Sequence, residues 1–204
     1  MDASIFDNHY EEYCRQINEL NLPGIKDTLA IELRGADAII PFFGVNYLVS
    51  GSGIVDEGGH QPDYGVCVIL AKYLLLSPET PAVNEEWASL KDFHKRSQLT
   101  NFNVFTSDAE RPILTTFTGR LAALSEAAHR LDGKPVDLGT SYDLSIEFNA
   151  LPRIKILLNF TDSDDEFPAS CSLLFQKQAE EYLDPESLIM IGIACAHRLQ
   201  RLVY

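Results

Sequence analysis

Three alternating segments between residues 142 and 175 constrain the fold more than any other feature of this sequence. Apolar side chains occupy every second position in residues 142–148, 154–160 and 169–175. A period of two places successive side chains on opposite faces of a β-strand, so each segment predicts a strand with one buried face. The connections between the segments are short and polar. Consecutive strands joined in this way are typical of an antiparallel meander.

The second connection, residues 162–168, concentrates carboxylates, with four in five positions: Asp162, Asp164, Asp165 and Glu166. Clustered carboxylates can hold calcium or magnesium through oxygen ligands. Phe167 and Leu173, however, stand where an EF-hand loop needs glycine and a bidentate glutamate. Mutual repulsion can instead raise a carboxyl pKa and supply a general acid. A third interpretation is a solvated hairpin tip that opposes edge-to-edge association.

Helices are predicted where apolar residues recur every three or four positions. These segments are residues 4–20, 25–34, 64–76, 108–131 and 185–202. Asp63 and Asp184 are placed to cap two of them, and Ser107 with Glu110 forms a capping box for a third. Residues 38–56 predict a strand, a break at Gly44 and a hairpin. Residues 79–100, which contain Trp87, predict an irregular excursion.

The order of these elements predicts the fold class. Strands and helices are segregated along the chain, and no sustained βαβ alternation is present. We therefore expect a single α+β domain over residues 1–204, with helices packed against one face of an antiparallel meander. Residues 1–34 would form N-terminal helices, and residues 35–204 would form the core.

The acidic composition limits the kinds of molecule that the protein is expected to bind. A net charge of -14, with only 16 Lys and Arg scattered along the chain, argues against nucleic acid. Metals, cationic ligands and basic protein surfaces fit this charge, and so does an acidic surface that simply keeps the protein in solution. The N-terminus lacks the pattern of a secretory signal, and no apolar run is long enough to span a membrane.

The spacing of the cysteines and histidines matches no metal-binding or catalytic motif. Four cysteines lie far apart in apolar segments, namely Cys14, Cys67, Cys171 and Cys195. They predict reduced core thiols of a cytoplasmic protein, with a disulfide pair left open. No HExxH, GxSxG or Cys-His signature is present, so the sequence leaves open whether the protein is an enzyme. Arg153 and Lys155 are expected to approach Asp143 or Glu147 across the sheet.

The segment that includes this meander resembles an uncharacterised bacterial and archaeal family of domains of unknown function. The resemblance is carried by an LPR turn, an apolar strand and a DxDxEFPA turn. Its matching residues are Leu151, Pro152, Arg153, Phe160, Asp162, Asp164, Glu166, Phe167, Pro168 and Ala169. Trp87 with residues 91–93 looks like a second motif, so the resemblance covers about residue 25 to the C-terminus. Gln176 departs from the aspartate expected there.

Some members of the family carry an appended iron-sulfur segment that this chain lacks. The resemblance therefore implies a setting in anaerobic redox or metal-cofactor metabolism, with a protein partner there as one expectation. It implies neither a reaction nor catalytic residues.

Three hypotheses for function follow. The first is a non-catalytic cytoplasmic accessory protein that binds a metal, cofactor or partner between the acidic connection and Trp87. Its candidate site residues are Asp162, Asp164, Asp165, Glu166, Phe167, Trp87 and Arg153, with Asp162, Asp164 and Glu166 as ligands for a divalent metal. The second is a hydrolase or lyase in which Asp164 and Glu166 act through such an ion. The third is a structural homodimer joined through the last helix.

Overall fold

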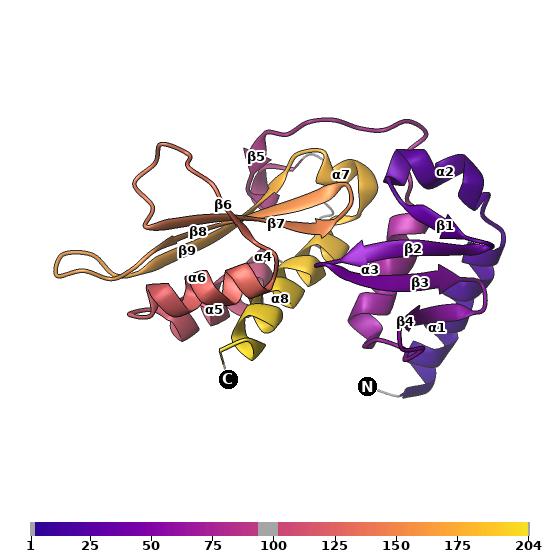
Figure 1. Cartoon of the computed structure of the whole chain (residues 1–204), viewed down its shortest axis with the longest axis horizontal. Coiled ribbons are helices and arrows are strands. Elements are labelled where there is room, and N and C mark those ends of the chain that lie inside the picture. The colour runs from indigo at the N-terminus through magenta and orange to yellow at the C-terminus, as the bar shows by residue number, and fades with distance from the viewer. Residues whose placement is uncertain (1–2, 94–101, 204) are drawn as a thin grey trace.

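The protein has two antiparallel β-sheets with helices packed against and between them (Figure 1). The structure is a computed structural model that describes residues 3–93 and 102–203. Buried side chains from both halves of the chain form one continuous hydrophobic core. The predicted α+β, single-domain class is therefore confirmed.

The C-terminal sheet contains the predicted meander. Its three long strands are β7 (Leu144–Leu151), β8 (Ile154–Thr161) and β9 (Ser170–Gln176). Two-residue strands, β5 (Trp87–Ala88) and β6 (Lys134–Pro135), extend its edges and give the order β5-β9-β8-β7-β6. Lys155 Nζ lies 2.8 Å from Glu147 Oε1 on the neighbouring strand, which confirms the expected cross-strand ion pair.

The N-terminal sheet contains β1 (Glu32–Arg34), β2 (Asp37–Phe42), β3 (Val45–Ser50) and β4 (Gly53–Asp56) in that order. The strand, break and hairpin predicted for residues 38–56 are present. The helix predicted over residues 25–34 is wrong in its second half. The helix there, α2 (Leu22–Leu29), ends at Ala30 in the left-handed conformation with φ of 53°. Residues 32–34 instead pair with β2, because a ten-residue apolar pattern fits either element and the neighbouring strand decides between them.

The remaining helices cover the sheets and lie between them (Figure 1). Helices α1 (Ala3–Asn18) and α3 (Tyr64–Leu75) pack together, and α8 (Pro185–Arg201) contacts α3 on one side. The short helices are η1 (Leu90–Asp92) and α7 (Ala179–Tyr182). The predicted caps are present, since Asp63 accepts from Val66 N and Asp184 accepts from Ser187 N.

The long helix predicted over residues 108–131 is broken. The chain forms α4 (Phe102–Phe105), a π-helical turn η2 (Thr106–Glu110), α5 (Arg111–Phe117) and α6 (Leu121–Arg130). The break falls at Thr118, with extended ψ, and at Gly119, with φ of +71°. Ser107 and Glu110 do not form the expected capping box. The Ser107 hydroxyl donates to Val104 O, and Glu110 Oε1 accepts from Leu173 N of β9.

The apolar side chains around α8 are covered largely by the chain itself. Helix α8 packs against α3, α5, α6 and η2, so contacts within the chain cover much of its apolar surface. The four cysteines are free, and three of them are buried, which agrees with the predicted core thiols. Across residues 3–93 and 102–203, no helix is both long enough and apolar enough to cross a membrane.

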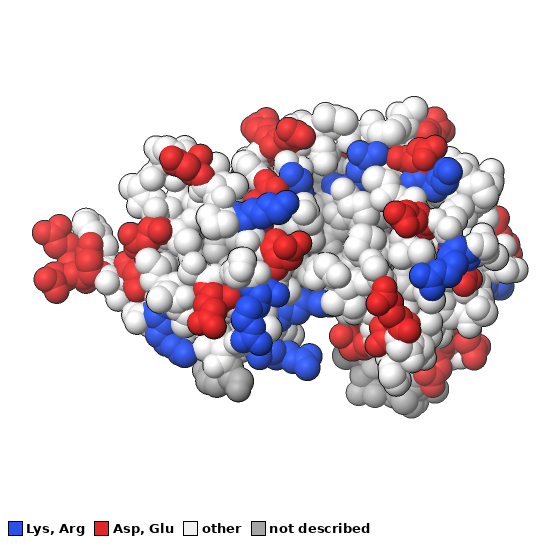
Figure 2. All heavy atoms as spheres, viewed as in Figure 1, with Lys and Arg blue, Asp and Glu red and all other residues white. Residues whose placement is uncertain are grey.

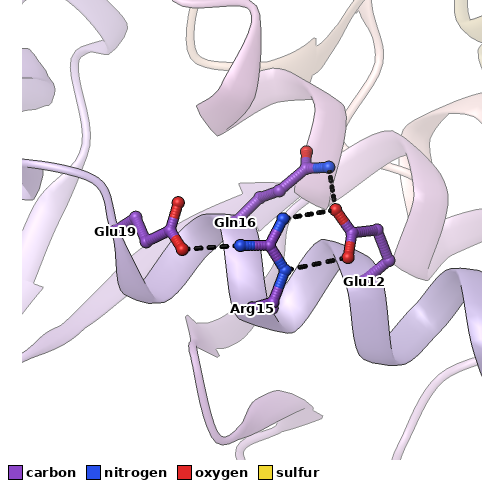
Figure 3. A network of polar contacts seen from close by, with 4 residues as sticks. All are labelled: Glu12, Arg15, Gln16 and Glu19. Atoms are coloured by element: carbon purple, nitrogen blue, oxygen red, sulfur yellow. Dashed lines mark hydrogen bonds and ion pairs between the residues drawn. The ribbon is translucent and has the colours of Figure 1, made fainter.

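The outer face of α1 carries an exposed polar network (Figure 3). The Arg15 guanidinium donates to both Glu12 carboxylate oxygens at 2.7 and 2.9 Å and to Glu19 Oε1 at 2.6 Å. Gln16 Nε2 donates to Glu12 as well. The Arg15 side chain is 58% exposed, so water competes for every one of these interactions. Exposed ion pairs of this kind contribute about 0–1 kcal/mol to stability.

The turn between β7 and β8, residues 150–153, joins the two halves of the molecule. Ala150 O accepts a hydrogen bond from Phe43 N at 3.0 Å, which links β7 to the turn between β2 and β3. The Arg153 guanidinium donates to Thr28 O at 3.0 Å and to Asp27 O at 2.9 Å, at the C-terminal end of α2. Asp27 O also accepts from Ala30 N at 3.3 Å, so Arg153 adds donors from the other sheet to the C-terminal end of the helix.

Tyr73 of α3 completes this junction from inside the core. Its hydroxyl donates to Leu29 O at 2.7 Å and accepts from Arg153 N at 3.2 Å. The side chain is fully buried, and its hydrogen bond to Leu29 O is shielded from water, whereas the bond from Arg153 N is partly buried. The LPR turn that carries the family resemblance is therefore a structural junction between α2, α3 and the two sheets.

Asp184, at the N-terminus of α8, makes the stability of the fold depend on pH. Burial alone raises the pKa of Asp184, but hydrogen bonds from Lys72 and Ser187 outweigh it and hold the pKa below its ordinary value near 3.8. The unfolded chain therefore binds this proton more readily than the folded chain does. The stabilisation is present above the ordinary pKa and is lost as the pH falls through the lower folded value.

We expect Asp184→Asn to flatten the acid limb of the stability profile, because asparagine still caps the helix but does not titrate. Unfolding by urea, repeated from about pH 5 downward, measures this slope. Asp165→Asn is the control, since Asp165 is exposed and makes no described hydrogen bond. Equal slopes for wild type and Asp184→Asn would contradict the assignment.

Candidate functional site

The acidic connection lies at the tip of the β8–β9 hairpin, which projects from the body of the molecule (Figures 1 and 2). Two of its four carboxylates, those of Asp162 and Asp164, accept hydrogen bonds from backbone N–H groups. Asp164 Oδ1 accepts from Glu166 N at 2.8 Å and Phe167 N at 2.7 Å. Asp162 Oδ1 accepts from Ser163 N and from Gly119 N, which fastens the hairpin to the corner between α5 and α6. The Phe167 side chain is 66% exposed.

This geometry opposes two of the predicted roles for the loop. The backbone hydrogen bonds from Phe167 and Glu166 lower the pKa of Asp164, so the raised pKa expected of a general acid is wrong for this residue. In the part of the chain that the structure describes, no three His, Cys, Asp or Glu side chains come together as metal ligands. The metal site predicted at Asp162, Asp164 and Glu166 is therefore not confirmed.

The structure also separates the residues predicted to form one site. Ser170 pairs with Thr161 beside the acidic loop, whereas Trp87 pairs with Gln176 at the opposite end of β9. Six residue steps at about 3.4 Å each put roughly 20 Å between these ends. Arg153 precedes β8 at the far end and is engaged with α2. The acidic loop and the pair Trp87 and Arg153 do not share a pocket.

A cleft of about 670 Å³ lies elsewhere, between the start of α3, the C-terminal half of α8 and the N-terminal sheet. Its size falls within the usual range for small-molecule sites. Tyr47 of β3 lines it, and its apolar surface comes from α3 and α8. These apolar residues are Val66, Ile69, Met190, Ile193 and Ala194. Gly65 of α3 faces α8 here, since an added Cβ would be 3.5 Å from Met190 Cε.

Arg198 of α8 is the side chain best held within this cleft. Its guanidinium carbon lies 4.9 Å from the Phe42 ring centroid and 5.4 Å from that of Phe43. Contacts of this kind orient a guanidinium without consuming its hydrogen-bond donors. Burial and an aromatic platform thus hold a cation at the cleft wall.

The aromatic platform rests on an unusual turn. Phe43 and Gly44 connect β2 to β3 with φ of 48° and 77°, the two positive values of a two-residue hairpin turn. Positive φ is uncommon for a bulky residue and persists only where the surroundings enforce it. Here the Phe43 N–H bonds to Ala150 O while its ring packs under Arg198. The turn therefore places both rings beneath the guanidinium.

The two walls of the cleft carry opposite charge. His197, Arg198 and Arg201 of α8 line one wall, and Asp56 and Asp63 line the other. Figure 2 shows a notch beside the C-terminal end of α8, with basic side chains on one side and acidic side chains on the other. Among the described residues, neither arginine forms an ion pair with a carboxylate. A backbone hydrogen bond from His60 lowers the pKa of Asp56, which favours the ionised form of this carboxylate at neutral pH.

Sequence reasoning missed this cleft for a physical reason. Basic residues in the last turn of a helix are ordinarily explained by the helix dipole. Their proximity to Asp56 and Phe42 depends on packing between segments more than 130 positions apart. A pattern within one helix contains no signal of that packing.

Two antiparallel sheets joined around α3 and α8, with a charged cleft beside them, define the chain as an α+β domain of mixed helix and sheet layers. It belongs to the family described as a domain of unknown function, DUF3786, whose family model matches residues 21–198. No curated protein and no solved structure matches the chain. The match includes both sheets and the cleft as far as Arg198. It confirms membership of a domain family of unknown function, while the iron-sulfur association stays a prediction.

Proposed function

We propose that this protein is a non-catalytic binding or accessory protein whose ligand occupies the cleft between α3 and α8. The ligand is a small organic molecule with an anionic group that contacts Arg198. The observation that carries the proposal is a partly buried guanidinium, stacked on two phenylalanine rings, that has no carboxylate partner among the described residues. Partial burial removes part of the hydration of this cation, and an anionic ligand group would compensate for that loss.

The rest of the cleft supports binding over covalent catalysis. Among the residues that the structure describes, its lining includes His197 but no serine, threonine or cysteine that could act with that histidine as a nucleophile. The first turn of α3 also faces the cleft, through Gly65 and Val66. The apolar side chains of α3 and α8 provide contact area for the body of an organic ligand.

The cellular setting of this proposal is the cytoplasm. Support comes from the four free cysteines and from the acidic composition of the chain. The family resemblance suggests metal-cofactor metabolism and a protein partner there. An accessory protein that holds a small organic cofactor or its precursor fits this setting.

The proposal is tested with a panel of organic anions: succinate, citrate, pyridoxal phosphate, coenzyme A and ATP. We expect at least one to raise the melting temperature in a saturable manner and to give a measurable isotherm by calorimetry. Arg198→Gln should weaken that binding about ten- to one-hundredfold, as expected for a lost charge-assisted hydrogen bond.

The matched control is Arg34→Gln, because Arg34 is exposed on β1 and lies away from the cleft. It should bind the same anion as the wild type does. If every anion fails to saturate, or if the two variants weaken binding equally, the cleft is not the site.

A further inference from the structure

The cleft combines features that no purely anionic ligand would satisfy. Arg198 and Arg201 face it from α8, and Asp56 and Asp63 face it from the opposite wall. Opposite charges attract, yet these groups do not meet as ion pairs, since a volume of about 670 Å³ lies among the lining residues. A simple anion would meet repulsion from the aspartates, and a simple cation would meet repulsion from the arginines.

Each wall has hydrogen-bonding capacity to spare. The Arg198 guanidinium is held by ring contacts, which leave its planar array of N–H donors free for a carboxylate. Asp56 uses Oδ1 for His60 N, and Asp63 uses Oδ1 for Val66 N. The second oxygen of each aspartate makes no described hydrogen bond and can accept one from an ammonium group.

From these observations, and resting on the proposed function of the cleft, we propose that its ligand is a zwitterion of the amino acid or short peptide class. The carboxylate of the ligand contacts Arg198, with Arg201 one helical turn away. Its ammonium group contacts Asp56 and Asp63. An apolar side chain lies between them on Val66, Ile69 and Ile193. One molecule thus neutralises both walls, and the volume of the cleft suits a short peptide better than it suits a single polar ion.

The experiment compares three probes by calorimetry on the full chain: leucyl-leucine, its N-acetyl derivative and its C-terminal amide. The first carries both charges, and each derivative lacks one of them. We expect the zwitterion to bind about ten- to one-hundredfold more tightly than either derivative, since each blocked terminus loses one charge-assisted hydrogen bond.

Variants assign each charge to a wall. The double variant Asp56→Asn, Asp63→Asn should lose the preference for the free amine, and Arg198→Gln should lose the preference for the free carboxylate. Asparagine retains the helix cap at position 63, so the double variant is expected to fold, and its melting temperature checks this. Asp165→Asn, in the distant hairpin loop, is the control and should keep both preferences.

The outcomes separate this inference from the broader proposal. N-acetyl leucyl-leucine that binds as tightly as the free peptide would overturn the zwitterion while leaving an anion site intact. If none of the three peptides binds but an anion from the panel binds saturably, the zwitterion is likewise overturned and the anion site stands. Failure of both the peptides and the anion panel would overturn the zwitterion and the cleft together.

Discussion

Replacing Tyr73 with phenylalanine is expected to lower the free energy of unfolding by about 2–4 kcal/mol. The ring would stay in place, but Leu29 O would lose a donor and Arg153 N would lose an acceptor. Both groups lie at the junction of α2, α3 and the β7–β8 turn, where the Tyr73 side chain is fully buried. A buried backbone group without a partner costs about 1–3 kcal/mol, and the partly buried Arg153 N adds to the cost at Leu29 O.

Urea unfolding measures the difference, and Tyr13→Phe is the matched control. Tyr13 lies partly buried on α1, and its hydroxyl makes no hydrogen bond with the described residues. We expect that variant to differ from wild type by less than about 0.5 kcal/mol. Similar losses in the two variants would mean that removal of a tyrosine hydroxyl, not the junction, accounts for the effect.

Replacing Arg153 with alanine is expected to lower the free energy of unfolding by about 2–3 kcal/mol. The guanidinium donates to Asp27 O and Thr28 O, two carbonyls at the end of α2. Hydrogen bonds from a charged donor contribute more than neutral ones, and partial burial of the bond to Thr28 O limits its replacement by water. The measurement is again urea unfolding.

Arg15→Ala provides the control. Arg15 makes more side-chain hydrogen bonds than Arg153 does, but we expect its removal to cost less stability. Arg15 makes three side-chain hydrogen bonds to carboxylates, all on the exposed face of α1 shown in Figure 3. We expect its removal to change stability by less than about 1 kcal/mol. If Arg15→Ala were the more damaging substitution, burial would not be the property that separates the two arginines.

Features set by local pattern were predictable from sequence. The alternation in residues 142–175 determined three strands, and the register that buries their apolar faces brings Lys155 beside Glu147. Asp63 and Asp184 cap helices because their side chains reach backbone N–H groups three residues ahead. In these cases, sequence neighbours supply the interaction.

Features that depend on distant partners were not predictable in the same way. The apolar stripe of residues 108–131 continues across Gly119, yet the helix breaks there, and Gly119 N bonds to Asp162 of the hairpin loop. The carboxylates of that loop look available in sequence, but backbone N–H groups occupy Asp162 and Asp164. The cleft likewise depends on α8 packing beside β2 and α3, which no segment of the sequence records alone.

The turn at Phe43 connects the cleft to the junction between the two sheets. The same residue bonds through its N–H to β7 and supports Arg198 with its ring. A ligand that fixes the guanidinium therefore also opposes separation of the two sheets. By reciprocity, any change that loosens the sheets weakens that ligand by the same coupling free energy. The free energy that couples binding at the cleft to cohesion at the junction is thus the same whether it is measured as a change in affinity or as a change in stability.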